Sequence, residues 1–222
     1  MHQKTILCYG DSNTWGYVPS ADYSLSKRRY SRNERWPGIL QNLLGQDLIL
    51  EEGLNSRATN IDYAVPPDRN GKTYLAPCLY SHAPIDLVIF ALGGNDAKSY
   101  FNRSAEQIRD GMAELINVVQ TSGYGKNLQD APRILLLTPC IPSPFVENMS
   151  DEKGVCFLAG AVAKITQLVS LYEQLAKEKN CFYLNLSDIK PSNLDGVHYD
   201  QAAHNEYAKM VSEKIKAIFC MG

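Results

Sequence analysis

Near its amino end the chain reads Thr5-Ile6-Leu7-Cys8-Tyr9-Gly10-Asp11-Ser12-Asn13-Thr14, an apolar run that turns abruptly polar. The run over 4–9 has the length of a strand and shows little alternation of apolar and polar residues. Such runs are typical of strands that are covered on both faces, as in the parallel sheets of α/β proteins. The polar turn after it predicts a passage from strand to helix.

Four further runs of the same kind follow along the chain, over 47–51, 86–92, 133–138 and 182–186. Helical patterns separate them. Ser104 and Gln107 form a capping box that predicts a helix start, and other helical patterns cover 36–44, about 155–179 and about 201–219. Alternating strands and helices predict a three-layer α/β/α fold with a parallel sheet of about five strands.

Two polar segments, 17–35 and 62–84, do not fit the strand and helix patterns, and we expect both to be long loops. The second contains Pro66, Pro67, Gly71 and Pro77. In open α/β sheets, ligands bind beyond the carboxyl ends of the strands, where long loops form the pocket walls. No linker interrupts the pattern, so residues 1–222 are expected to form a single domain.

Composition limits the partners that the chain is expected to bind. The formal net charge is −2, which provides no positive field for nucleic acid or for an anionic membrane. The six cysteines include no Cys-x-x-Cys pair, so we expect reduced thiols and a cytoplasmic location. A small-molecule substrate is expected, without nucleic acid or membrane, and homo-oligomers are left open.

Ser12 follows the first strand, so its hydroxyl should lie at the carboxyl edge of the sheet. Serine is a weak nucleophile at neutral pH and needs a general base that a third group orients. Among the four histidines, His198 is the best candidate, because it stands in a glycine-containing loop between the last strand and the last helix. Asp195 precedes it by three residues and can turn its carboxylate toward the imidazole.

Two more polar loops end at the same edge. Gly53-Leu54-Asn55-Ser56-Arg57 follows the second strand, and Gly93-Gly94-Asn95-Asp96 follows the third. Acyl transfer requires donors where negative charge develops on the tetrahedral oxygen. The side-chain amide of Asn95 and the backbone N–H groups of Ser12 and Ser56 are the candidate donors of this oxyanion hole.

Several neighbouring residues are candidates for the wall of a substrate pocket: Trp15, Tyr17, Asn55, Tyr74, Phe101 and Val197. Aromatic residues near a turn are equally common as core filling. Asp11 and Asp96 invite a metal interpretation, but aspartate at a strand-to-helix turn more often accepts bonds from backbone donors. We therefore expect no metal and no cofactor.

Together these blocks carry a family resemblance. Gly10-Asp11-Ser12, the loop with Gly53 and Ser56, Gly94-Asn95-Asp96 and Asp195-x-x-His198 resemble, in order, the four blocks of the GDSL-type or SGNH hydrolases. The stretches 10–19 and 51–60 resemble the bacterial arylesterase and acyltransferase branch. The resemblance implies a flavodoxin-like fold, Ser12 as nucleophile, His198 as base, Asp195 as orienting acid, and Asn95 with the Ser56 N–H in the oxyanion hole.

At two positions the chain departs from this family. Ser56 stands where many members carry glycine, and Asn13 stands where the motif has leucine.

The sequence leads to one favoured function and two alternatives. The favoured one is a serine esterase that hydrolyses small carboxylic esters with short acyl chains, or transfers their acyl groups. A carbohydrate or cell-wall O-acetyl esterase would use the same residues. A non-catalytic small-molecule binding module of the same fold is the alternative outside enzymes. A nucleotide-binding protein is disfavoured, because no Gly-x-x-x-x-Gly-Lys or Gly-x-Gly-x-x-Gly run is present.

Overall fold

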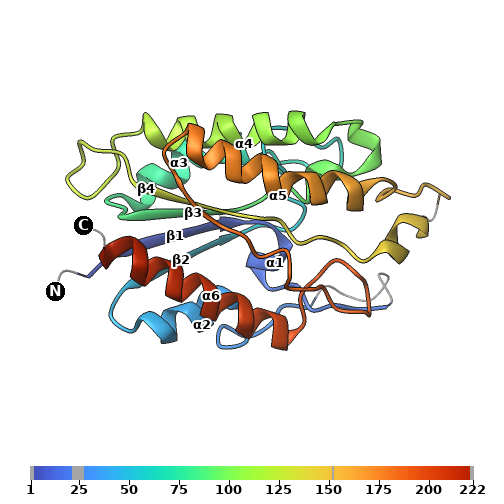
Figure 1. Ribbon diagram of the computed structural model, residues 1–222, viewed down its shortest axis with the longest axis horizontal. Coiled ribbons are helices and arrows are strands. Elements are labelled where there is room, and N and C mark those ends of the chain that lie inside the picture. The colour runs from blue at the N-terminus through green and yellow to red at the C-terminus, as the bar shows by residue number, and fades with distance from the viewer. Residues whose placement is uncertain (1–2, 22–27, 152, 221–222) are drawn as a thin grey trace.

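The structure is a computed structural model that describes residues 3–21, 28–151 and 153–220. Its centre is a parallel sheet of five strands in the order β2-β1-β3-β4-β5 (Figure 1). The strands are β1 (Thr5–Gly10), β2 (Leu48–Gly53), β3 (Leu87–Ala91), β4 (Arg133–Leu137) and β5 (Phe182–Leu184). All five fall on the apolar runs, so the predicted sheet is confirmed.

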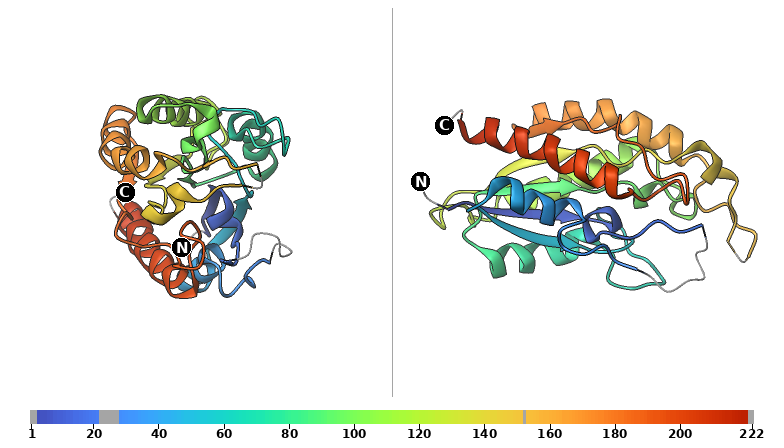
Figure 2. Two further views of the ribbon diagram at one scale, coloured as in Figure 1. Left: turned by 90° about the vertical axis from the view of Figure 1, so that its right-hand side faces the viewer. Right: turned by 90° about the horizontal axis from the view of Figure 1, so that it is seen from below.

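Helices cover both faces of the sheet (Figures 1 and 2). One face packs against α2 (Trp36–Leu44) and α6 (Gln201–Cys220). The other face packs against α3 (Gly71–His82), α4 (Ala105–Gln120) and α5 (Ala161–Glu178). The three-layer α/β/α prediction is confirmed, and the strand order is that of flavodoxin-like folds.

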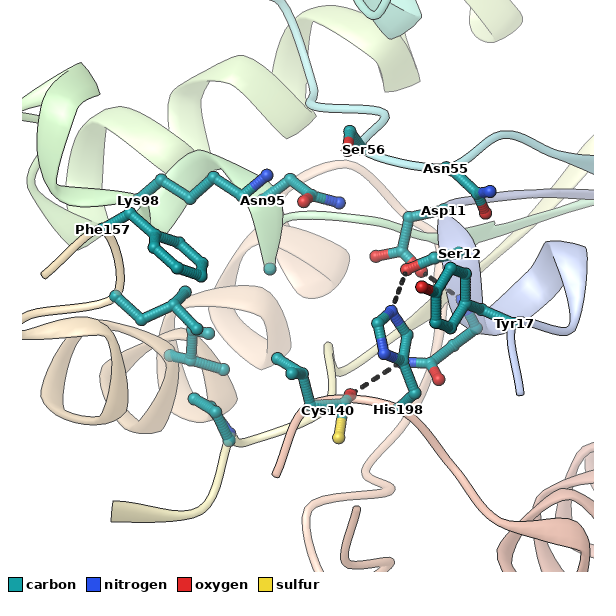
Figure 3. A pocket seen from close by; sticks show the side chains of 16 residues that line it. Asp11, Ser12, Tyr17, Asn55, Ser56, Asn95, Lys98, Cys140, Phe157 and His198 are labelled. Atoms are coloured by element: carbon teal, nitrogen blue, oxygen red, sulfur yellow. Dashed lines mark hydrogen bonds between the residues drawn. The ribbon is translucent and has the colours of Figure 1, made fainter. Parts of the chain in front are cut away.

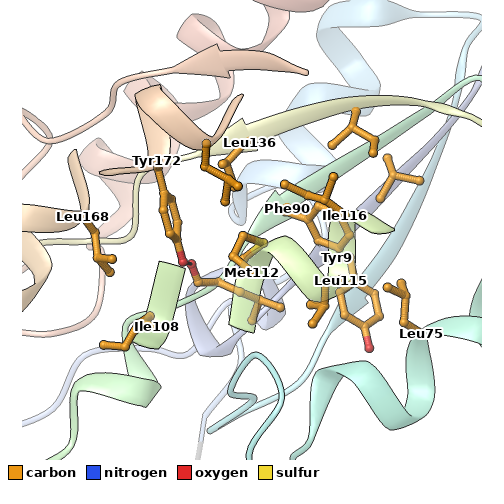
Figure 4. Packing of buried hydrophobic residues seen from close by; sticks show 14 of the residues in the cluster. Tyr9, Leu75, Phe90, Ile108, Met112, Leu115, Ile116, Leu136, Leu168 and Tyr172 are labelled. Atoms are coloured by element: carbon orange, nitrogen blue, oxygen red, sulfur yellow. Dashed lines mark hydrogen bonds between the residues drawn. The ribbon is translucent and has the colours of Figure 1, made fainter. Parts of the chain in front are cut away.

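The core explains why the strand runs are apolar throughout. Ile6 and Cys8 of β1 are buried against α2 and α6, whereas Leu7 and Tyr9 are buried against the opposite helices. On that second face the Tyr9 ring packs edge-on against Phe90 of β3, at 6.0 Å between ring centroids (Figure 4). Because both faces are covered, successive side chains must all be apolar.

One predicted loop is wrong in part. Within 62–84 the chain forms α3, which begins where the Asn70 side chain accepts hydrogen bonds from the N–H groups of Lys72 and Thr73. Pro77 lies inside this helix and removes one helical hydrogen bond. Leu75, Cys78 and Leu79 are nevertheless buried in the core, so tertiary packing overrides the local signal.

The starts of helices α4 and α5 are each set by a local feature of the chain. The capping box of Ser104 and Gln107 is present at the start of α4, as predicted. The helix expected over about 155–179 begins only at Ala161, because Gly160 has a left-handed φ of +74° that ends the preceding loop.

The loop expected over 17–35 contains no helix in its described part, and residues 22–27 of it lie outside the described residues. Short 3-10 turns complete the chain at η1 (Asn95–Ala97), η2 (Ser99–Phe101) and η3 (Pro144–Asn148). Within the described ranges, every helix is too short or too polar to cross a lipid bilayer.

Candidate active site

The site lies where the sheet changes direction of winding. From β1 the chain passes to β2 on one side, and β3 lies on the other side of β1. Loops therefore diverge at the carboxyl ends of β1 and β3, which is where ligands bind in folds of this kind. Ser12 follows β1 and Asn95 follows β3, so both reach this crevice.

Ser12 is held by a short helix, α1 (Ser12–Trp15). The Asp11 carboxylate caps this helix by accepting the N–H of Asn13 at 3.0 Å. α1 rests directly on the end of β2, and a Cβ on Gly53 would lie only 2.2 Å from the backbone nitrogen of Trp15. Glycine at position 53 thus leaves room for α1, which holds Ser12 at the carboxyl edge of the sheet.

A chain of hydrogen bonds joins the predicted nucleophile, base and acid. The Ser12 Oγ lies 3.0 Å from His198 Nε2, a bond that Figure 3 shows. His198 Nδ1 lies 2.8 Å from Asp195 Oδ2. The other carboxylate oxygen of Asp195 accepts the N–H groups of Val197 and His198 at 3.0 and 2.9 Å. Burial alone would raise the pKa of Asp195, but its bonds with His198 and Val197 hold that pKa below its usual range. The carboxylate is thus ionised and faces the imidazole.

Asn13 connects the serine turn to the histidine loop. Its side chain donates to the Val197 carbonyl at 3.3 Å and accepts the N–H of Tyr199 at 2.9 Å. These bonds flank His198 on both sides in the sequence. Tyr17 stacks on the imidazole, with 4.3 Å between ring centroids. From the sequence, Asn13 is only a departure from the family motif, because its role depends on contacts across 184 residues or more.

The oxyanion candidates lie on the opposite side of Ser12. Ser56 has a left-handed φ of +64°, a conformation that glycine adopts without strain, which explains why glycine suits this position. The Asn95 amide donates one hydrogen to the Arg57 carbonyl at 3.1 Å, which orients the group. In the described part of the chain, the N–H groups of Ser12 and Ser56 make no hydrogen bond. These donors are therefore available to a developing oxyanion.

Asp96, by contrast, is occupied. Its buried carboxylate accepts from Thr59 Oγ1 and from Arg103, each at 2.6 Å. It ties the loop after β3 to the loop after β2. Burial raises its pKa to about 6, against the lowering effect of Thr59 and Arg103. The preferred interpretation of Asp96 as an acceptor for neighbouring donors agrees with these contacts.

A pocket of about 270 Å³ opens beside Ser12. Three of the predicted wall residues line it, namely Tyr17, Asn55 and Val197. The apolar wall comes from residues that the sequence did not single out: Pro142, Phe157, Leu158 and Ile165. They lie before α5 and in its first turns. Because these segments are far from Ser12 in the sequence, local patterns did not predict that they reach the pocket.

Lys98 is the charged residue in this wall that sequence reasoning missed. Its ammonium group bonds the Tyr63 hydroxyl at 3.2 Å, and no described carboxylate lies within ion-pair distance. Burial lowers the pKa of Lys98 to about 8, and the charges of Asp11 and Asp96 oppose this effect. The sequence signal for Lys98 was its position three residues after Asn95, close to a loop that was already predicted to reach the site. The ammonium group has donors left for a polar atom of a substrate.

The other three aromatic candidates lie elsewhere. The Arg29 guanidinium lies over the Trp15 ring, with its Cζ atom 5.0 Å from the ring centroid. Tyr74 stacks against Tyr9, and Phe101 packs edge-on against the Tyr63 ring. None of the three is among the residues that line the pocket beside Ser12, so the prediction is corrected for them.

Comparison with known proteins agrees with this arrangement. Residues 8–207 match the GDSL-like lipase/acylhydrolase family, which is most of the chain. The chain belongs to that family. The comparison with curated proteins found no match.

Solved structures of esterases have the same fold as this family member. A carbohydrate acetylesterase from Sinorhizobium meliloti is 34% identical, with a TM-score of 0.89 over 97% of this chain and 100% of that one. The native aryl esterase of M. smegmatis is 35% identical, with a TM-score of 0.87 over 96% and 99%. A lipase/acylhydrolase from Enterococcus faecalis, at 16% identity and a TM-score of 0.63, shares the fold. The protein is a carboxylic ester hydrolase of the GDSL type.

Proposed function

We propose that this esterase cleaves small carboxylic esters with short acyl chains through a Ser12–His198–Asp195 triad. The observation that carries the proposal is the continuous hydrogen-bond chain from Ser12 Oγ through both imidazole nitrogens to Asp195. Each member has the partner that its role requires.

In the first step Ser12 Oγ attacks the ester carbonyl while His198 Nε2 takes the hydroxyl proton. Asp195 stabilises the imidazolium that forms and holds the tautomer in which Nε2 is free to accept. His198 then donates that proton to the departing alcohol, and the acyl group remains on Ser12. Water or another alcohol, deprotonated by His198, releases the acyl group and regenerates the hydroxyl of Ser12.

The oxyanion of each tetrahedral intermediate would be bound by the N–H groups of Ser12 and Ser56 and by the Asn95 amide. The bond from Asn95 to the Arg57 carbonyl orients this amide before substrate arrives. Preorganised donors cost no reorganisation during the reaction, and the loss of one costs about 3 to 4 kcal/mol.

The pocket supports a preference for short acyl chains. Its volume of about 270 Å³ lies below the range of about 300 to 1,000 Å³ that is usual for sites of drug-sized ligands. Phe157, Leu158 and Ile165 line one side of it. An acetyl or propionyl group fits such a space better than a long chain does.

A specific observation favours the second candidate, an O-acetyl esterase that acts on carbohydrate. Lys98 lines the pocket with ammonium donors beyond its single bond to Tyr63. A sugar presents several hydroxyl and ring oxygens that can accept such a hydrogen, whereas a p-nitrophenyl group presents only weakly accepting nitro oxygens beyond the ester itself. Replacing Lys98 by methionine should lower kcat/KM on acetylated sugars more than on p-nitrophenyl acetate. Equal losses on both would remove this support.

We further propose that the enzyme acts on soluble small molecules in the cytoplasm, without nucleic-acid or membrane partners. The net charge of −2 and the six free cysteines support this view.

The triad is tested by Ser12→Ala with p-nitrophenyl acetate, for which kcat should fall by about 10⁴-fold or more. Ser170→Ala is the matched control, because Ser170 is exposed on α5. A fluorophosphonate should label the wild-type protein and the control but not Ser12→Ala. Unlabelled wild-type protein would favour the binding-module alternative, and an octanoate optimum in a p-nitrophenyl ester series would refute the preference for short chains.

A further inference from the structure

A second group of reactive side chains lies away from the pocket, between the edge strand β2 and helix α3. Glu52, Cys78 and His82 bring their ligand atoms within 4.8 Å of one another. Glu52 Oε1 and His82 Nε2 lie 2.9 Å apart. The esterase chemistry uses none of the three.

The fold brings these side chains together by ordinary periodicity. Cys78 and His82 are four residues apart on α3, so they project from the same face of the helix. Glu52 lies on β2, where successive side chains point to opposite faces. Glu51 pairs with Arg35 on the α2 side, and Glu52 therefore turns toward α3.

The donor set matches the preferences of zinc. Thiolate, imidazole and carboxylate are its three protein ligands, at distances of about 2.0 to 2.3 Å in tetrahedral geometry. Such bonds place neighbouring ligand atoms about 3.3 to 3.7 Å apart. The three ligand atoms lie within 4.8 Å of one another, so each pair needs to shift by about 1 Å or less to reach these spacings, and small side-chain rotations can supply that movement.

Solvent can provide the fourth ligand. The side chains of Glu52 and His82 are 20% and 28% exposed, whereas Cys78 is buried. A site with three protein ligands and one water is a known zinc arrangement. The charges also balance, since a carboxylate and a thiolate together neutralise a divalent ion.

We propose that Glu52, Cys78 and His82 form a binding site for one divalent late transition metal ion, with zinc as the preferred ion. Binding replaces the thiol proton of Cys78 by the metal, with the proton released to solvent, and no oxidation or reduction occurs.

The site is close to the oxyanion side of the active site. Arg57 donates to the Glu52 carbonyl, and its own carbonyl holds the Asn95 amide. A metal ion bound by residues of β2 and α3 would thus stabilise the start of the loop after β2, which carries Ser56 and Arg57. Metal that binds only the folded state should raise the midpoint of thermal unfolding.

Cobalt is the probe of choice, because Co²⁺ takes the same ligands and its thiolate complex absorbs in the near ultraviolet. Protein treated with chelator and then dialysed is titrated with Co²⁺ under reducing conditions. We expect a thiolate-to-cobalt charge-transfer band that saturates at one ion per chain. Added Zn²⁺ should abolish the band, since zinc displaces cobalt from such ligands.

Variants locate the site. Cys78→Ser should remove the band, and His82→Ala should weaken Co²⁺ binding at least about tenfold. Cys181→Ser is the matched control, because Cys181 is a part-buried cysteine at β5 and should leave the band unchanged. Circular dichroism melts check that each variant folds. The absence of a band in wild-type protein, or its survival in Cys78→Ser, would overturn the proposal, and neither outcome bears on the Ser12 chemistry.

Discussion

Replacing Asp195 by asparagine tests how the imidazole of His198 is kept in its basic form. One oxygen of Asp195 accepts the backbone N–H groups of Val197 and His198, and the other lies 2.8 Å from His198 Nδ1. In Asp195→Asn the two N–H groups retain the amide oxygen, so the NH₂ group must face Nδ1. It then donates to Nδ1, and the ring proton moves to Nε2. His198 can no longer accept the Ser12 proton.

The expected loss in kcat is about 10⁴-fold, equivalent to about 5 kcal/mol, the size seen when a buried triad aspartate is replaced in a serine protease. Hydrolysis of p-nitrophenyl acetate measures it, with KM changing little, because the pocket wall is untouched. Asp200→Asn is the matched control, since exposed Asp200 accepts the Ala203 N–H at the start of α6 and asparagine caps a helix equally well. A loss smaller than tenfold would refute this tautomer argument.

Three further predictions follow from the site and its support. Ser56→Gly should keep kcat/KM, because the proposed donor at this position is a backbone N–H. It should change the free energy of unfolding by less than about 1 kcal/mol, since relief of the left-handed strain offsets the added entropy of the unfolded chain. A large loss of activity would instead give the Ser56 hydroxyl a role. Asn13→Ala should lower kcat on the order of 100-fold with KM nearly unchanged, because both hydrogen bonds that flank His198 are lost. An unchanged kcat would contradict this positioning role of Asn13. Burial lowers the pKa of His204 to about 4 from an ordinary 6.5, so only the unfolded chain takes up a proton between these values. Stability should therefore fall by up to about 3 kcal/mol as the pH drops from 6.5 to 4. Urea unfolding of His204→Asn, which keeps an acceptor for the Trp36 N–H, should show a weaker pH dependence.

Much of the fold, and the meeting of the loops that carry the candidate catalytic residues, could be predicted from local patterns. Five apolar runs became the five strands, because a strand covered on both faces must be apolar along its whole length. The loops with Ser12, Ser56, Asn95 and His198 meet at one rim, because parallel strands all end at the same edge. Position along the chain thus implied position in space for these residues.

Helix α3 and the pocket wall could not be predicted in this way. The segment 62–84 combines turn-forming residues with a helix that is stabilised by burial of Leu75 and Leu79. The direction of Tyr74 and Phe101 depends on which neighbours they pack against, and neither lines the pocket beside Ser12. Local propensity carries no information about such contacts.

For this chain, the sequence alone determined the alternation of strands and helices, and it placed the candidate residues Ser12 and His198 in loops that end at one edge of the sheet, since both follow from the order of elements along the chain. Only the tertiary structure decided that Asn13 bonds the histidine loop, that Lys98 enters the pocket, and that Glu52 meets Cys78 and His82. The physical reason is that side-chain contacts between distant segments depend on how helices pack on the sheet. Periodicity sets the face from which a residue projects, and packing sets what it touches.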